Sequence, residues 1–388
     1  MTATLPEVRT LTPTTLPVVF DARVVTGSGG GPDKTILNSP RFLEPLGYRM
    51  LCGYLTPPND PGYAEIEAKA AKYNAPLITV PDRGPWDVRI VRNLLRVLKR
   101  ERVAIWHGHD YKSNALGLLL RKFHRMKLVT TVHGWVQKTT RLPFYYKVDK
   151  WCLPRYERVY CVSDDLFAEC KAIGVQADKL VLLENAIDTD DYLRRQTVAQ
   201  AKAKLNLPAN TKLIGAVGRL SEEKAFDELI RAVTAIPDVS LMIVGEGHDR
   251  PRLEALVKEL NITTRVTLPG WRSDVRDVYE ACDVLALSSH REGLPNVLLE
   301  ALALEVPVVS TNVNGIPRLI THNENGLLVN AGDVPALNSS LTELLGNDTK
   351  CDAFRRNGRR TVEDRFSFPA RMKILADDYD TLLAGGRS

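Results

Sequence analysis

The chain has 388 residues, of which 44% are apolar and 26% are charged, and its formal net charge is +5. This length is too great for one ordinary hydrophobic core and predicts two domains, while the composition excludes a disordered chain. No run of about 18 apolar residues occurs, and the first ten residues lack the basic-then-apolar order of a secretory signal. The six cysteines form no C-x-x-C pair. We therefore expect a cytoplasmic protein with no membrane-spanning helix and with buried free thiols.

Short apolar runs rich in Val, Ile and Leu alternate with helical patterns along the chain. The first half contains such runs at residues 17–20, 48–52, 76–80, 103–107, 127–132, 158–162 and 180–184. The second half contains them at residues 212–217, 240–244, 265–268, 283–287 and 307–310. Strands buried on both faces have this composition, and the spacing between the runs is that of βαβ crossovers. The pattern predicts an α/β fold of two Rossmann-like, doubly wound domains that face a cleft.

The βαβ pattern occurs twice, with a join between Asp188 and Thr211 where a strand ends and a short helix and turn follow. We expect one domain over residues 1–190, a second over residues 191–370, and a final helix over residues 371–388 that packs back on the first domain. Ligands of such sheets bind outside the carboxyl ends of the strands.

A glycine-rich loop, in the segment VTGSGGGPDKTIL, follows the first expected strand. Gly29, Gly30 and Gly31 allow backbone amides to face a phosphate group or an acceptor. The spacing is not G-x-G-x-x-G, so the dinucleotide-binding fingerprint is absent.

Positive charge is concentrated between Arg83 and Arg158, where 18 Lys and Arg residues stand against 5 Asp and Glu residues. In WDVRIVRNLLRVLKRERV, one helical stripe is apolar, with Trp86, Ile90, Leu94 and Leu98. The cations lie away from this stripe, at Arg89, Arg92, Arg96, Lys99 and Arg100. Two interpretations remain open: a core-facing helix with a solvated basic side, or a helix that docks on an anionic membrane surface. Segment 141–155 mixes aromatic residues with cations and fits either of these two interpretations. We expect no nucleic-acid partner.

Two histidine segments follow strands in the first half. HGHDYKS contains His107, His109 and Asp110, which could hold a metal ion, but no further cluster of metal ligands supports that interpretation. We expect no metal and expect His109 and Asp110 to line the acceptor side of the site. His133 in TTVHGW ends a strand, where a structural histidine is the alternative to a ligand contact.

The segment AVGRLSEEKAF places Arg219 and Lys224 five residues apart in a loop between a strand and a helix. Gly218 permits a tight turn, and two cations with helix amides suit a diphosphate. The alternative is that both cations are solvated and pair with Glu222 or Glu223.

The segment HREGLPNVLLEALA follows another strand and carries Glu292 and Glu300, eight positions apart. Gly293 permits close approach of backbone to a ligand, and Pro295 suits the first turn of a helix. The amino end of that helix offers free N–H groups to phosphate or sugar oxygens. The alternative places Glu292 in solvent and pairs Glu300 with an arginine.

Together, GRLSEEK, the E-x7-E element and VPVVSTNVNGIPRLI resemble the retaining glycosyltransferases of the GT-B group called family 4. The resemblance covers nearly the whole chain. It implies an N-terminal acceptor domain and a C-terminal donor domain. Arg219 and Lys224 are then expected to grip the donor diphosphate, Glu292 to contact the transferred sugar, and Glu300 to bind the ribose. Backbone at five positions is expected to contact sugar and phosphate: Gly293, Leu294, Pro295, Asn296 and Val297.

The resemblance also assigns roles outside the two main motifs. LPGWRSDV matches the region that holds the nucleobase, so Trp271 and Arg272 are candidates for that contact. His133 is expected near the hydroxyls of the donor sugar, and it joins Glu292, Arg219 and Lys224 as a catalytic candidate. Asn185 lies in a segment similar to the family's Asn-Gly-Ile-Asp turn and is expected on the acceptor side.

Three residues depart from the family pattern. Ala225 and Glu305 stand where glycine is usual, and Arg318 stands where glutamate is frequent. We expect Ala225 to be harmless at a helix start. Glu305 and Arg318 are either compensating surface changes or changes to the donor pocket.

The resemblance implies a metal-independent transfer of sugar, with retention, from a nucleotide sugar to a glycan, lipid-linked or other glycoconjugate acceptor. UDP is expected more than GDP, and no cofactor is expected. Three other functions compete: a non-hydrolysing nucleotide-sugar epimerase of the same fold, a dinucleotide-dependent oxidoreductase, and a binding protein with an inactive site. The missing G-x-G-x-x-G argues against the second, and the intact Arg219, Lys224, Glu292 and Glu300 argue against the third.

Overall fold

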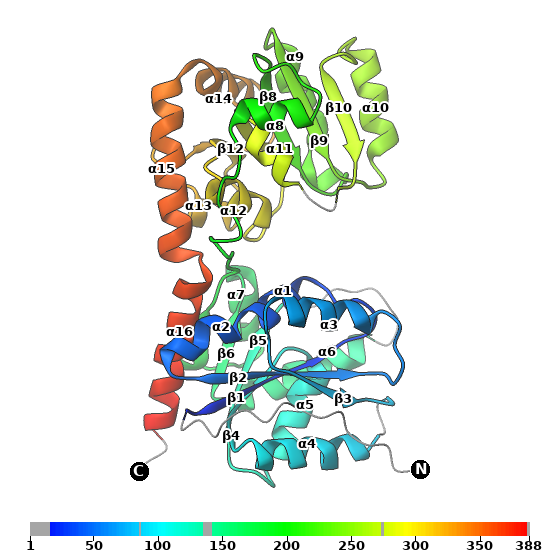
Figure 1. Cartoon of the computed structure of the whole chain (residues 1–388), viewed down its shortest axis with the longest axis vertical. Helices are drawn as coiled ribbons and strands as arrows, with labels where there is room; N and C mark the ends of the chain where they lie inside the picture. The colour runs from blue at the N-terminus through cyan, green and yellow to red at the C-terminus, as the bar shows by residue number, and fades with distance from the viewer. Residues whose placement is uncertain (1–15, 85–86, 135–141, 273–274, 386–388) are drawn as a thin grey trace. The chain divides into compact units, whose positions relative to one another are not determined.

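The computed structural model describes residues 16–84, 87–134, 142–272 and 275–385. The chain divides into two compact units, Met1–Leu182 with Met372–Ser388 and Leu183–Arg371 (Figure 1). Trp86 and residues 1–15 lie outside the described residues, so the expectations that rest on them stay predictions.

The first unit contains a parallel sheet with the strand order β3-β2-β1-β4-β5-β6-β7. The strands are β1 (Val18–Val24), β2 (Arg49–Thr56), β3 (Leu77–Pro81), β4 (Val103–Gly108), β5 (Lys127–Val132), β6 (Arg158–Cys161) and β7 (Leu180–Leu182). The helices are α1 (Gly31–Asn38), α2 (Pro40–Leu43), α3 (Tyr63–Lys72), α4 (Arg89–Arg100), α5 (Tyr111–Leu120), α6 (Leu142–Cys152) and α7 (Asp164–Ala172). Short 3-10 turns occur at Glu44–Leu46, Leu153–Arg155 and Ala177–Lys179. The order of the strands reverses between β1 and β4, so ligand-binding loops are expected at the carboxyl ends of these two strands.

The second unit contains a parallel sheet with the order β10-β9-β8-β11-β12-β13. The strands are β8 (Lys212–Val217), β9 (Val239–Val244), β10 (Val266–Gly270), β11 (Val284–Leu287), β12 (Val308–Thr311) and β13 (Leu327–Val329). The helices are α8 (Val198–Lys204), α9 (Phe226–Thr234), α10 (Arg250–Glu259), α11 (Arg276–Ala281), α12 (Asn296–Ala303), α13 (Ile316–Leu319), α14 (Val334–Gly346) and α15 (Asp348–Arg365), with a 3-10 turn at Glu222–Lys224. Here the strand order reverses between β8 and β11, which precede the two main motifs.

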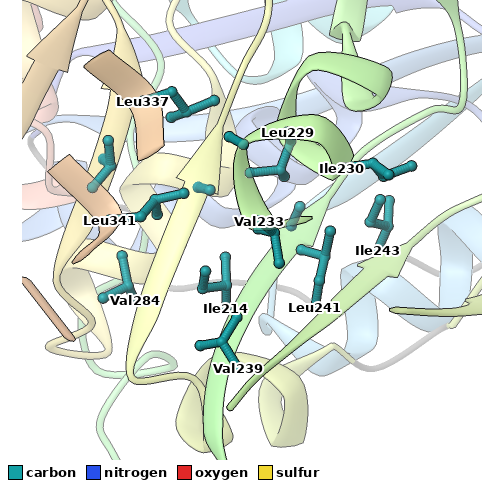
Figure 2. Close-up of a cluster of buried hydrophobic side chains, with 14 of the residues drawn as sticks. Ile214, Leu229, Ile230, Val233, Val239, Leu241, Ile243, Val284, Leu337 and Leu341 are labelled. Atoms are coloured by element: carbon teal, nitrogen blue, oxygen red, sulfur yellow. The ribbon is translucent and has the colours of Figure 1, made fainter. Parts of the chain in front are cut away.

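One of the two large buried clusters of the second unit lies between its sheet and α9, α10 and α14, and Figure 2 shows its side chains from the strands, α9 and α14. Ile214 and Val239 from the strands pack with Leu229, Val233 and Leu341 from the helices, and each is at most 5% exposed. Burial of one such side chain stabilises the fold by roughly 1.5–3 kcal/mol. This packing fixes the loops at the carboxyl ends of β8 and β11 on a rigid support.

The last helix, α16 (Phe368–Ala384), contributes its residues from Met372 onward to the first unit. Asp378 accepts from Arg158 Nε and Tyr160 Oη, both at 2.7 Å, and Tyr48 Oη donates to Asp380 at 2.6 Å. These bonds, with the fully buried ring of Tyr379, attach the helix to the first sheet.

The first unit ends at Leu182, whereas the sequence placed the boundary at residue 190. Ile187 N donates to Phe366 O at 2.8 Å, and Phe368 N donates to Ile187 O at 3.1 Å. Because these bonds pair the segment after β7 with the chain at the start of α16, residues 183–190 belong to the second unit.

All twelve predicted apolar runs contain strands, and an α/β fold of two Rossmann-like units is confirmed. The strand β13 is not among the predicted runs. The six cysteines are buried and free. Among the described residues, no helix combines the length and the apolar character that crossing a bilayer requires.

Candidate active site

The loops after β8 and β11 bring Lys224 and Glu292 together at the carboxyl edge of the second sheet. Lys224 Nζ lies 2.5 Å from Glu292 Oε1, and Ser289 Oγ donates to the same oxygen at 2.6 Å. The side chains of Lys224 and Glu292 are 18% and 9% exposed. This edge is where doubly wound sheets bind their ligands. The pair therefore joins the two main motifs, which are far apart in the sequence, at a single point.

The same two loops are also joined by hydrogen bonds to the backbone carbonyls of Glu223 and Lys224. His290 N donates to Glu223 O at 2.9 Å, and Ser288 Oγ donates to Lys224 O at 2.9 Å. Because these bonds fix one loop against the other, the ammonium of Lys224 and the carboxylate of Glu292 are positioned by backbone geometry as well as by their own attraction.

Arg219 forms an ion pair with Glu223, as the alternative interpretation of its loop anticipated. Both side chains are exposed, at 66% and 47%, and the hydrogen bond from Arg219 lowers the pKa of Glu223. Exposed ion pairs contribute about 0–1 kcal/mol. Arg219 can therefore exchange Glu223 for a phosphate group at little cost, whereas Lys224 is held by Glu292.

The helix α12 begins at Asn296, and Pro295 is its N-cap residue rather than part of its first turn. Among the described residues, no side chain caps this helix end. Gly293 and Asn296 are exposed, Val297 is half-buried, and Leu294 and Pro295 are buried. Leu298 N donates to Pro295 O at 3.1 Å, which leaves the amides of Asn296 and Val297 to face an anion, since a helix end carries partial positive charge.

Glu300 is held by two tyrosines and not by an arginine. Tyr192 Oη donates to its Oε1 at 2.8 Å, and Tyr279 Oη donates to its Oε2 at 2.9 Å. Burial and the charge of Glu300 raise the pKa of both tyrosines, so each hydroxyl keeps its proton. A carboxylate oxygen can accept two hydrogen bonds, so each oxygen of the half-buried Glu300 retains capacity for a ligand hydroxyl.

Trp271 and Arg272 follow directly after β10, and both side chains are exposed. The Trp271 side chain is the larger, and the residue is 72% exposed. An exposed indole at the carboxyl end of a strand can stack on a planar ring such as a nucleobase. Their exposure is compatible with the predicted contact to the nucleobase, and that contact stays a prediction.

The first unit brings together Asp21, from the middle of β1, and His107, His109 and His133, from the carboxyl ends of β4 and β5. His109 Nε2 contacts Asp21 Oδ1, and His109 Nδ1 lies 2.9 Å from His133 Nε2. The three imidazole rings stack, with centroids 4.6 Å apart for His107 and His109 and 5.2 Å apart for His109 and His133. Asp21, His107 and His109 are buried, whereas His133 is half-buried. His133 is thus not isolated, and Asp21 is a partner that the sequence prediction missed.

Asp110 has a structural role in addition to the acceptor-side position that the sequence predicted, and that position stays a prediction. Its carboxylate accepts from the backbone amides of Lys112 and Ser113 as the N-cap of α5, and from Val24 N at 2.8 Å. Burial raises its pKa, and these amides oppose that effect. The carboxylate is therefore committed to fixing the start of α5 against β1.

The glycine-rich loop of the first unit is held by two carboxylates. Gly30 N donates to Asp33 Oδ2 at 2.5 Å, and Gly27 N donates to Asp60 Oδ2 at 2.7 Å. Asp33 thus supplies negative charge at the start of α1, and the contact of this loop with a phosphate group or an acceptor stays a prediction. Gly29, at φ +75°, lies where a Cβ would come within 2.4 Å of Asp33, so it allows the loop to close on that carboxylate.

The structure shows the surroundings of Glu305 and Arg318, which are two of the three departures from the family pattern. Glu305 is exposed at the carboxyl end of α12, which is the end opposite to the Gly293 segment, so it is a surface change. Arg318 makes two bonds to Glu184, at 2.9 and 3.2 Å, which identifies a surface ion pair. Asn185, the neighbour of Glu184, is half-buried and belongs to the second unit.

Ala225 is less harmless than expected. It is buried and precedes α9 with φ +47° and ψ +42°, in the left-handed region that favours glycine. An alanine in this region costs roughly 1–2 kcal/mol. The substitution thus places backbone strain directly beside Lys224.

Comparison with known proteins identifies the family. Residues 198–361 match glycosyl transferases group 1, and residues 29–191 match Glycosyltransferase Family 4. The lipopolysaccharide core biosynthesis glycosyltransferase LpsE of Rhizobium meliloti is 35% identical over 189 residues, which are 49% of this chain and 54% of that protein. The UDP-Gal:alpha-D-GlcNAc-diphosphoundecaprenol alpha-1,3-galactosyltransferase of Escherichia coli is 27% identical over 307 residues, 76% of this chain and 79% of that protein.

Solved structures show the same fold. Anabaena HepE in complex with UDP superposes with a TM-score of 0.77 at 18% identity, over 94% of this chain and all of that one. This likeness confirms the GT-B fold. None of these matches supports the epimerase alternative. The chain therefore belongs to the group 1 glycosyltransferases of family 4 and is an enzyme that transfers a sugar from a nucleotide sugar.

Proposed function

We propose that this glycosyltransferase uses a UDP-sugar, retains the configuration of the anomeric carbon and needs no divalent metal. The observation that carries the proposal is the pairing of Lys224 with Glu292 directly before the uncapped first turn of α12. A cation with free amides can neutralise a leaving diphosphate without a metal ion. The adjacent carboxylate can accept hydrogen bonds from sugar hydroxyls.

In the proposed reaction, the bond between the anomeric carbon and the diphosphate oxygen breaks, and the acceptor hydroxyl attacks from the same face. The proton of that hydroxyl passes to the departing diphosphate oxygen, so the transfer needs no carboxylate nucleophile. Arg219, Lys224 and the α12 amides stabilise the charge that develops on the leaving group. Glu292 then holds the sugar, and Glu300, oriented by its two tyrosines, holds the ribose.

The names of relatives support the choice of donor and acceptor. The Escherichia coli relative takes UDP-Gal and acts on a lipid-linked diphosphoundecaprenol acceptor, and the Rhizobium relative acts in lipopolysaccharide core biosynthesis. We therefore propose a UDP-sugar donor and a glycan or lipid-linked acceptor in the synthesis of a polysaccharide or glycoconjugate.

The outer face of α4 supports a membrane surface as a further partner. Ile90, Leu94 and Leu98 are buried, as the interpretation of a core-facing helix required, so a membrane would meet the opposite face. An open groove of about 350 Å³ lies on α4. It is lined by a second row of apolar side chains, Val88, Val91 and Leu95, and by three cations, Arg92, Arg96 and Lys99. Val88 is 79% exposed. Apolar side chains flanked by cations suit the interface of an anionic bilayer, where a lipid-linked acceptor lies.

In the test, the purified chain is incubated with UDP- or GDP-sugars and with lipid-linked or glycan acceptors in the presence of EDTA. Proton NMR then reads the anomeric configuration of the product. We expect transfer from a UDP-sugar with the donor's configuration retained. An inverted product, or activity that EDTA abolishes and Mg²⁺ restores, contradicts the proposal. Turnover of a nucleotide sugar without acceptor points instead to the epimerase.

A further inference from the structure

Tyr192, one of the two tyrosines that bind Glu300, lies in a segment of turns and irregular chain. This segment, residues 189–196, is part of the connection between β7 and α8. The backbone carbonyls of such a segment need donors from outside it wherever water is excluded. The position of the half-buried Tyr192, and with it the bond from its hydroxyl to Glu300, therefore depends on the groups that bind these carbonyls.

Arg359 of α15 binds carbonyls of this segment and of α12 at the same time. Its Nη1 donates to Tyr192 O at 2.8 Å and to Ala303 O at 2.6 Å, and its Nη2 donates to Thr189 O at 3.1 Å. The side chain of Arg359 is only 12% exposed. Ala303 stands three residues after Glu300 on α12. One guanidinium thus joins the two parts of the chain whose side chains, Tyr192 and Glu300, are hydrogen-bonded to each other.

Arg276 makes the corresponding connection to α11. Its guanidinium donates to Leu193 O at 2.9 Å and to Asp191 O, and its Cζ lies 5.6 Å from the centre of the Tyr192 ring. Tyr279, the other tyrosine that binds the same carboxylate, stands three residues later on this helix. Two arginines therefore tie the Tyr192 segment to the helix of the second tyrosine and to the helix of the carboxylate.

We propose that Arg359 and Arg276 are positioning residues of the donor site, which hold Tyr192 where its hydroxyl orients Glu300 toward the ribose hydroxyls. The inference rests on the proposed function, in which Glu300 binds the ribose. A carboxylate that accepts from two hydroxyls of one ribose must present both oxygens in a fixed orientation. Arg359 acts on this orientation through the Tyr192 backbone and the α12 backbone, and Arg276 acts through the carbonyls on either side of Tyr192.

The bonds of Arg359 exceed what capping of α12 requires. The last carbonyls of a helix have no partner within the helix, and a cation near them is favourable. A bond to Ala303 O alone would therefore make Arg359 a capping residue. The bonds to Tyr192 O and Thr189 O add nothing to the helix end, and they fix the segment that carries the tyrosine. A cap affects stability alone, whereas a positioning residue of this site affects the recognition of ribose hydroxyls.

Nucleotides with and without ribose hydroxyls separate these two roles. Calorimetric titration of the full chain compares UDP with 2′,3′-dideoxy-UDP, and GDP with its dideoxy form. We expect Arg359→Gln and Arg276→Gln each to weaken binding of the ribonucleotide about 3- to 10-fold, the effect of one hydrogen bond, and to weaken that of the dideoxy nucleotide less than about 2-fold. In a Tyr192→Phe background, Arg359→Gln should cost less than about 2-fold more, because the bond that it positions is already absent. Arg360→Gln, at the neighbouring exposed arginine of α15, is the matched control and should change neither affinity.

An Arg359→Gln variant that weakens both nucleotides equally, or whose effect adds in full to that of Tyr192→Phe, has a general structural role and contradicts the inference. If Arg359→Gln does not fold, Arg359→Lys makes the same comparison, because an ammonium keeps the charge but lacks the planar fork that reaches three carbonyls. Unchanged affinity for the ribonucleotide in that variant overturns the inference.

Failure of the proposed function is distinguishable, because it shows in the unaltered chain. A chain that binds GDP and not UDP refutes the proposed donor, and the GDP pair then tests the two arginines. A chain that binds both members of a pair equally refutes the ribose contact of Glu300 and the inference with it. A chain that prefers the ribonucleotide, and keeps that preference in Arg359→Gln and Arg276→Gln, removes only the role of the arginines.

Discussion

Glu305 holds a backbone conformation that glycine adopts without strain. Its φ is +57°, and the helix α12 ends there with Val306 N donating to Ala301 O and Glu305 N donating to Leu302 O. This is the Schellman arrangement, in which the left-handed residue is usually glycine. Because the side chain is exposed, its removal leaves no cavity.

We therefore expect Glu305→Gly to stabilise the second unit by roughly 0.5–1 kcal/mol, the relief of left-handed strain less the added freedom of the unfolded chain. Urea unfolding followed by tryptophan fluorescence measures the change. Glu324→Gly, at an exposed position without a left-handed φ, is the control and should stabilise nothing. A Glu305→Gly variant that unfolds at a lower urea concentration than the parent contradicts the expectation.

Lys224 and Arg219 differ in how firmly the protein holds them, and their variants should differ accordingly. Loss of one group that stabilises a developing oxyanion costs about 10²–10³ in kcat. We expect this loss for Lys224→Ala and for Arg219→Ala, with little change in the acceptor KM. Lys224→Ala should also lower stability, because it leaves the carboxylate of Glu292 without its cation.

Steady-state kinetics with both substrates varied, together with thermal unfolding, measures these effects. Lys212→Ala, an exposed lysine at the opposite end of β8, is the control. Unchanged kcat in both variants would remove the proposed role of the two cations.

Tyr192 and Tyr279 orient Glu300, so their hydroxyls should matter for the nucleotide. We expect Tyr192→Phe and Tyr279→Phe each to weaken UDP binding about 3- to 10-fold, which corresponds to one hydrogen bond of roughly 0.5–1.5 kcal/mol. Calorimetric titration with UDP measures the change, with Tyr73→Phe of the first unit as control. An unaltered UDP affinity in both variants would show that Glu300 does not depend on its tyrosines, or does not contact the nucleotide.

At the scale of elements, the two faces of α4 differ in burial. One row of apolar side chains is buried, and the other, bordered by Arg92, Arg96 and Lys99, faces outward. Each cation near an anionic bilayer contributes about 1 kcal/mol. We expect the triple change of these cations to Ser to weaken binding to vesicles that contain anionic lipid by about 10²-fold.

Vesicle flotation at physiological salt measures this binding. The triple change of Lys34, Lys72 and Lys171 to Ser removes the same charge from other exposed helical positions of the first unit and should have a much smaller effect. Equal loss in both triples would indicate a general effect of net charge, and flotation that does not depend on anionic lipid would exclude the docking of α4.

The strands and α4 could be predicted because their patterns are local. A strand buried on both faces reads as an apolar run, and a helix reads as a stripe with its own period. The strand β13 was missed, although the equally short β7 was predicted, and Pro295 was placed one position too far into α12 because the cap depends on backbone geometry.

The candidate site could be predicted only as a set of residues and not as a set of contacts. The bond between Lys224 and Glu292 depends on the pairing of β8 with β11, which no local pattern contains. Asp21 follows the apolar run Val18–Phe20 inside β1, and an acidic residue in a central strand was the available signal. The partners of Asp110 and Gly30, which are the amides of α5 and the carboxylate of Asp33, could not be predicted because they come from local capping and tertiary packing.

At the scale of the whole molecule, each unit places its candidate residues at the point where its strand order reverses. In the first unit this point carries the stacked rings of His107, His109 and His133 beside Asp21, and in the second it carries the pair of Lys224 and Glu292. The proposed sugar transfer depends on the pair of Lys224 and Glu292, because the charge of the leaving diphosphate has to be neutralised there.

A crystal structure of the chain with UDP tests this claim most directly. The account predicts the diphosphate against Lys224, Arg219 and the first amides of α12, with the ribose hydroxyls on Glu300. Binding of UDP at any other place, with Lys224 and Glu292 still joined and without contact to the nucleotide, would contradict it.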